Sequence, residues 1–106
     1  MRKIESAMCE AVRFCRDFTS ANTTVVTETD CSKVYLHGNH IATVGADYCM
    51  LFDGGWQTVT TKSRLNALLE EFGPDGSRVY QKDFQWYVWE PKQQKGYDFF
   101  NGYSFA

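Results

Sequence analysis

Two histidines and one aspartate come nearest to a catalytic set in this chain. His37 and His40 flank a Gly-Asn pair, and Asp53 begins an Asp-Gly-Gly turn. A hydrolase or nuclease would need these three side chains in one cleft, with a nucleophile within reach of a base. The spacing places neither a nucleophile nor a third metal ligand beside the histidines. We therefore expect surface histidines at a turn, with no catalytic residue, no metal site and no cofactor.

Two basic residues at the start of a predicted helix offer a different chemistry. Lys62 and Arg64 could contact phosphate, because a helix N-terminus favours anions. The order helix, three strands, helix is also that of double-stranded-RNA-binding domains, although the lysine cluster of that family is absent. A net charge of −2 argues against nucleic-acid binding by bulk electrostatics. A nucleic-acid-binding module is therefore the alternative function, and a solvated basic pair is the simpler explanation.

Aromatic residues are concentrated in the last third of the chain, where ten lie between Tyr80 and Phe105. A C-terminal strand that closes the sheet would account for them. An exposed interaction face would also account for them, because aromatic residues dominate interface hot spots and a small domain buries few rings. A homodimer or another partner protein would fit such a face. The candidate partner-binding residues are Tyr80, Trp86, Tyr87, Trp89, Phe99 and Phe100.

The four cysteines form no C-x-x-C pair, and a metal site would need such a pair or a comparable cluster, so zinc is not expected. No signal-like apolar segment is present at the N-terminus, and no apolar run approaches the length of a membrane span. We therefore expect reduced, mostly buried thiols and a cytoplasmic protein without a membrane segment.

The hydrophobic pattern positions these residues on a single α+β domain. An amphipathic helix is predicted over residues 3–18, and β-branched or alternating runs predict strands between residues 24 and 52. A second helix is predicted from about Lys62 to Phe72, with Thr60, Thr61 or Ser63 as its N-cap. The expected architecture is an antiparallel sheet of about five strands with two helices on one face, in the order α-β-β-β-β-α-β.

The C-terminal segment is predicted to stand apart from that domain. Residues 1–90 form the domain, and residues 91–106 form an aromatic tail packed on the domain or on a partner. Within the tail, Asn101-Gly102 separates two aromatic runs, a strong signal for a β-hairpin.

One segment carries a family resemblance. The residues LFDGGWQTVTTKSRLNALLEEFG, with YLHGNHIATVG upstream and FQWYVW downstream, resemble small uncharacterised proteins of tailed bacteriophages. Those proteins begin with an IESAM-like helix, as Ile4–Met8 does here, and the resemblance covers roughly residues 3–89. It implies a phage accessory protein acting in the host bacterial cytoplasm. With the aromatic segment, it favours a non-enzymatic protein that binds a host or phage protein, as anti-CRISPR inhibitors of bacterial defence do.

Overall fold

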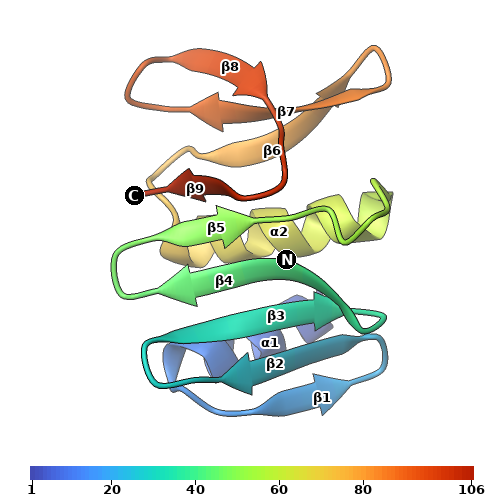
Figure 1. The fold of residues 1–106 in the computed structure, drawn as a ribbon, viewed down its shortest axis with the longest axis vertical. Coiled ribbons are helices and arrows are strands. Elements are labelled where there is room, and N and C mark those ends of the chain that lie inside the picture. The colour runs from blue at the N-terminus through green and yellow to red at the C-terminus, as the bar shows by residue number, and fades with distance from the viewer.

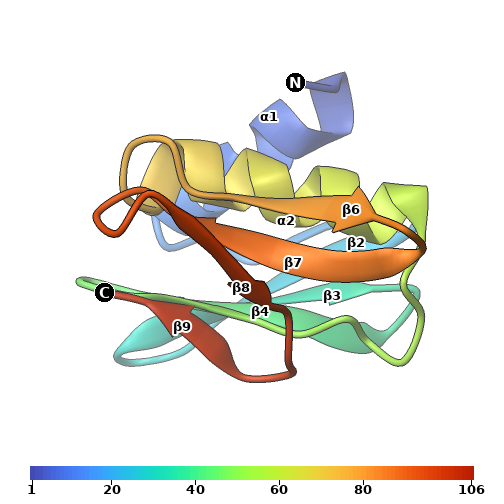
Figure 2. The same ribbon diagram turned by 90° about the horizontal axis from the view of Figure 1, so that it is seen from above.

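Two helices cover one face of a six-stranded antiparallel sheet, and a separate three-stranded sheet lies beside α2 (Figures 1 and 2). The computed structural model describes all of residues 1–106. The large sheet has the strand order β1-β2-β3-β4-β5-β9 and the small one β6-β7-β8. The elements are α1 (Lys3–Arg13), β1 (Phe18–Ser20), β2 (Thr23–Thr27), β3 (Cys31–Leu36), β4 (Asn39–Gly45), β5 (Cys49–Leu51), α2 (Val59–Phe72), β6 (Arg78–Lys82), β7 (Gln85–Glu90), β8 (Lys95–Asp98) and β9 (Tyr103–Phe105). The predicted α+β class with two helices is confirmed.

The core lies between the helices and the large sheet. Alternate residues of β3 are buried, as the period of a strand with one covered face requires. The predicted apolar stripe of α2 is confirmed, because Leu65, Leu68 and Leu69 are buried and Phe72 packs against the same cluster. The other face of the large sheet carries no helix (Figure 2).

Helix α1 is shorter than its hydrophobic pattern predicts. It ends at Arg13, and Cys15 turns the chain with a φ of 53°. Phe14 and Cys15 are exposed, whereas Phe18 leaves the helix and begins β1. The predicted helix was too long because Phe18 fits its apolar stripe but packs against the core from a strand.

Helix α2 begins earlier than predicted. Its N-cap is Thr58, whose Oγ1 accepts a hydrogen bond from the Thr61 N–H at 3.0 Å. Residues 60, 61 and 63 all lie inside the helix, so none of them supplies the cap. Thr58 is the N-cap because its backbone is extended, which places its hydroxyl oxygen where it accepts a bond from a free N–H of the first turn.

The β3–β4 hairpin turns one residue earlier than the predicted Gly-Asn pair. Leu36 pairs with Asn39, so His37 and Gly38 form the two-residue loop, with φ values of 52° and 77°. The register shifts after Val34, which leaves Ile41 as the extra residue of a bulge. Because of this bulge, the consecutive residues Ile41 and Ala42 are both buried.

The predicted C-terminal hairpin is wrong, although its turn is present. Strand β8 pairs with β7 in the small sheet, whereas β9 pairs with β5 and becomes the edge of the large sheet. Tyr103 and Phe105 are buried on the helix side of that sheet, and the Gly102 N–H donates to the Leu51 carbonyl at 2.8 Å. Residues 91–106 therefore contribute a strand to each sheet.

The side chain of Asn66 joins α2 to the small sheet through two hydrogen bonds. Asn66 donates to the Val79 carbonyl at 2.9 Å and accepts from the Val79 N–H at 2.7 Å, so its side chain pairs with β6 as a neighbouring strand would. Val79, Trp86 and Val88 are buried on the inner face of this sheet. This sheet lies at one end of the long axis of the molecule (Figure 1). No helix of the structure is long and apolar enough to span a membrane.

Candidate functional site

Three of the six predicted partner-binding rings lie together on the outer face of the small sheet. Tyr80 on β6 is paired with Tyr87 on β7, and their rings stack at 5.6 Å between centroids. Trp89 follows two residues after Tyr87 and so projects from the same face. All three rings are half-buried. We call Tyr80, Tyr87 and Trp89 the aromatic face.

Within the aromatic face, the ring of Tyr80 lies over Gly96 and beside the guanidinium of Arg78. A Cβ at Gly96 would lie 1.9 Å from the Tyr80 hydroxyl oxygen, so the ring of Tyr80 reaches across the sheet into the space that a side chain on β8 would fill. The Arg78 guanidinium lies 5.6 Å from the centroid of the same ring. These contacts, with the stacking on Tyr87, hold the ring of Tyr80 in position.

The other three predicted rings do not join this face. Trp86 is only 2% exposed, because it projects from the opposite side of β7, and it meets Phe99 edge-on at 5.3 Å. Phe99 is half-buried against the core. Phe100 is 59% exposed but lies beside Tyr103 at the turn into β9. Because side chains alternate between the two sides of a strand, the sequence alone places Trp86 on the opposite side of β7 from Tyr87 and Trp89.

The two predicted phosphate-contacting residues are separated by the structure. Arg64 is 3% exposed, and its guanidinium donates to Glu5 Oε2 at 2.8 Å, Thr23 Oγ1 at 3.0 Å and Asn22 Oδ1 at 3.2 Å. Lys62 reaches Gln81 on the small sheet instead. The hypothesis of a basic pair at the helix start is therefore wrong, because Arg64 is enclosed and already paired.

Glu5 is the counterion of this buried arginine, and sequence reasoning missed it. Burial alone would raise the pKa of Glu5, but hydrogen bonds from the Ser63 hydroxyl, the Arg2 backbone N–H and Arg64, with the charge of Arg64, hold that pKa below its usual value. Fifty-nine residues separate the two partners in the chain. No local pattern links positions so far apart, so only the fold reveals the pair.

The two predicted histidines lie in different surroundings, and Asp53 is in the lining of one pocket with His37 and of another with His40. His37 is exposed at its turn, while His40 lies between the rings of Tyr35 and Phe52 and bonds Thr43 Oγ1 through Nε2 at 2.8 Å. Burial lowers the pKa of His40. No three His, Cys, Asp or Glu side chains are grouped so that they could hold a metal ion.

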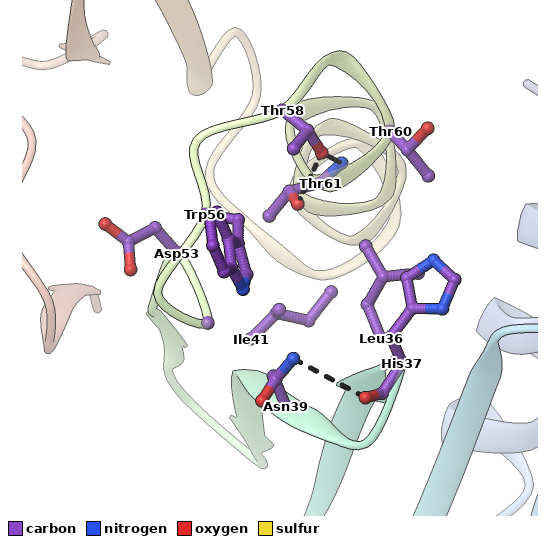
Figure 3. Close-up of a pocket in the computed structure, with 10 residues that line it drawn as sticks. Leu36, His37, Asn39, Ile41, Asp53, Trp56, Thr58, Thr60 and Thr61 are labelled. Atoms are coloured by element: carbon purple, nitrogen blue, oxygen red, sulfur yellow. Dashed lines mark hydrogen bonds between the residues drawn. The ribbon is translucent and has the colours of Figure 1, made fainter.

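A pocket of about 350 Å³ lies where the loop before α2 faces the β3–β4 turn (Figure 3). Leu36 and Ile41 line its apolar interior, and Trp56, which is 70% exposed, forms one wall. Asn39 and the threonines at the start of α2 add polar groups. Trp56 and Asn39 were not among the predicted site residues. The position of Trp56 directly after the Gly54-Gly55 turn was the sequence signal that could have indicated an exposed ring.

The loop that carries Trp56 is held by the hydrogen bonds of Asp53. Asp53 accepts the Gly55 N–H at 2.8 Å and a weaker bond from Gln57 at 3.4 Å, while its own N–H donates to Asn101 Oδ1 at 2.8 Å. Gly54 has a φ of 69°, and a Cβ there would lie 3.1 Å from Ile41, so the backbone packs directly against the pocket floor. The pocket is therefore a defined feature of the fold.

Comparison with known proteins gives one match. The family model described as Kyanoviridae Gp96 protein matches residues 1–106. The match thus includes the C-terminal segment that the sequence resemblance left out. No curated protein and no solved structure matches the chain.

Proposed function

Because the chain belongs to the Kyanoviridae Gp96 protein family, and is therefore a bacteriophage protein, we propose that it acts without catalysis, by binding another protein through its aromatic face. The observation that carries this proposal is the grouping of Tyr80, Tyr87 and Trp89 on one outward side of the small sheet. These residue types, with arginine, are the ones that supply most interface energy.

The surroundings of the aromatic face favour a protein over a nucleic acid. Arg78 and Lys82 lie on the same side of β6 as Tyr80, and Asp98 on β8 is paired with Tyr87, so charges of both signs surround the rings. An apolar centre with a polar rim of mixed charge is typical of protein interfaces. A nucleic-acid surface would instead carry an excess of positive charge. With Arg64 buried, the alternative function has lost one of its two named contacts.

The partner we propose is a host protein in the bacterial cytoplasm, belonging to a defence system that the phage must inhibit. Membership of a phage family and the small size of the chain support this assignment. A rigid aromatic face suits an inhibitor, because pre-ordered rings cost little entropy on binding. A second copy of this chain on the same face is the competing outcome.

The test compares three tagged proteins in pull-downs from nuclease-treated host lysate. They are the wild type, the double variant Tyr87→Thr/Trp89→Thr and the control Phe14→Ala, which removes an exposed ring from the end of α1. Trp86 is left intact because it is buried. We expect the double variant to keep its circular dichroism spectrum and lose the captured protein, and the control to keep both. The captured protein is then purified and titrated directly against each variant.

Two outcomes would overturn the proposal. One is capture of the same partner by the wild type and the double variant. The other is a wild-type dimer in light scattering that the double variant abolishes, because the face would then be occupied by a second copy of the chain. Loss of all capture after nuclease treatment, with binding retained in untreated lysate, would favour the nucleic-acid alternative instead.

A further inference from the structure

The pocket beside Trp56 is separate from the aromatic face. It is formed by the loop before α2 and by the β3–β4 turn, whereas the aromatic face belongs to β6 and β7 (Figures 1 and 3). Any function of this pocket is therefore independent of the proposed protein partner.

The interior of the pocket suits a flat ring. The indole of Trp56 stands on one side, the side chain of Leu36 on the other, and Ile41 lies below them (Figure 3). Rings of nucleic-acid bases are commonly held in this way, between an aromatic and an apolar side chain. Its volume of about 350 Å³ is at the small end of the range for ligand pockets. One ring system would fill it.

Apart from His37 and Asp53, the polar groups of the pocket are uncharged amide and hydroxyl groups. The Asn39 amide bonds only weakly within the chain, to the His37 carbonyl at 3.5 Å, so its oxygen and one N–H are free for a ligand. The Thr61 hydroxyl bonds Thr58 Oγ1 and retains one further bonding position. An amide that both donates and accepts is suited to the edge of a nucleobase.

The charges around the pocket do not favour a phosphorylated ligand. No lysine or arginine lines it, and His37, the one histidine in the lining, is exposed at its turn. The single acidic residue, Asp53, points away from the cavity and binds its own loop through both carboxylate oxygens (Figure 3). A phosphate placed there would have no lysine or arginine to pair with, and it would have a carboxylate nearby.

From these features the geometry points to a site for one uncharged heteroaromatic ring of the nucleobase class, stacked on Trp56 and bonded at its edge by Asn39. A free nucleoside and an unpaired base of a nucleic-acid strand both present such a ring. The lack of lysine and arginine in the lining favours the free nucleoside, because a strand brings phosphates with it.

The experiment titrates the protein with adenosine, uridine, AMP, a short single-stranded DNA and glucose, followed by calorimetry and by tryptophan fluorescence. We expect adenosine or uridine to bind with a Kd of about 1 mM or lower, and AMP and the strand to bind no more tightly. Trp56→Ala should weaken nucleoside binding on the order of tenfold or more, and Trp56→Phe should restore part of it. Trp89→Ala, the same substitution on the aromatic face, should leave it unchanged.

Several results would contradict this inference. Absence of nucleoside binding to the wild type, or equal binding by Trp56→Ala, would remove the site. Binding of glucose without either nucleoside would assign the pocket to another class of ligand. Tighter binding of AMP or of the strand than of adenosine would refute an uncharged ligand. None of these results bears on the aromatic face, whose variants are tested separately.

Discussion

Replacing Glu5 by Gln tests whether the buried ion pair holds α1 to α2. Glu5 and Arg64 are 2% and 3% exposed, and no water can replace the lost carboxylate without opening the core. Removing one partner of a buried pair costs about 3–5 kcal/mol, because the other charge stays buried without compensation. The whole free energy of unfolding of a domain this size is roughly 5–15 kcal/mol. The variant should therefore lose a large part of its stability.

The Gln side chain keeps the volume of Glu, so no cavity contributes to this loss. It also keeps one oxygen that can accept from the Ser63 hydroxyl or from Arg64. Thr23 and Asn22 remain bonded to the guanidinium. The change therefore reports the missing charge. At about 4–8 °C per kcal/mol for a small domain, the Tm should fall by at least about 12 °C.

The assay is urea unfolding followed by circular dichroism, with thermal melts in parallel. The matched control is Glu10→Gln, which removes the carboxylate of the Glu10–Arg16 pair from the exposed side of the same region. That pair has side-chain exposures of 58% and 61%, so its loss should cost less than about 1 kcal/mol. Equal stability of the two variants would refute the argument from burial.

The same pair predicts an acid dependence. Because the folded-state pKa of Glu5 is lowered, its stabilising contribution is complete above the ordinary value of 4.5 and is lost as the pH falls through the folded-state pKa. The wild type should therefore lose stability below about pH 4.5 faster than Glu5→Gln does. A constant difference in unfolding free energy between the two proteins across this range would contradict the assigned pKa shift.

Two further predictions concern other buried groups. Burial lowers the pKa of His40 from 6.5, so the wild type should lose stability as the pH falls below that value, and His40→Gln should show a flatter Tm profile between pH 7 and pH 5. Native protein treated with iodoacetamide should be alkylated at exposed Cys15 but not at Cys9 or Cys49, whose burial raises their pKa to about 12. Mass spectrometry identifies the labelled thiols, and alkylation of Cys49 without denaturant would contradict the prediction.

The parts of the fold that were predicted from sequence depend on local patterns. The leucine stripe of α2 and the alternation of β3 each lie within one element, so their periods identify both the element and its buried face. The boundaries were less accurate. The N-cap Thr58 was missed because several neighbouring residues could also cap the helix. Phe18 was placed in a helix because it fits the apolar stripe, although its packing puts it in a strand.

The parts of the fold that were not predicted depend on contacts between residues that are far apart in the sequence. Asn101-Gly102 does turn the chain, but nothing near it reveals that Tyr103 pairs with Leu51 across 52 residues instead of with β8. The buried Glu5–Arg64 pair and the pocket beside Trp56 have the same origin, because each joins segments that meet only in the fold. The sequence did predict the aromatic face in part, since Tyr87 and Trp89 alternate along one strand.

The pairing of β9 with β5 has a consequence for synthesis. Until β9 leaves the ribosome, β5 has no partner on one side, and its backbone groups form an open strand edge. The loop that carries Trp56 also lacks its bond from Asn101 until that segment is made. The large sheet therefore cannot be completed before Tyr103–Phe105 are synthesised. Chains truncated before β9 would expose a strand edge prone to aggregation.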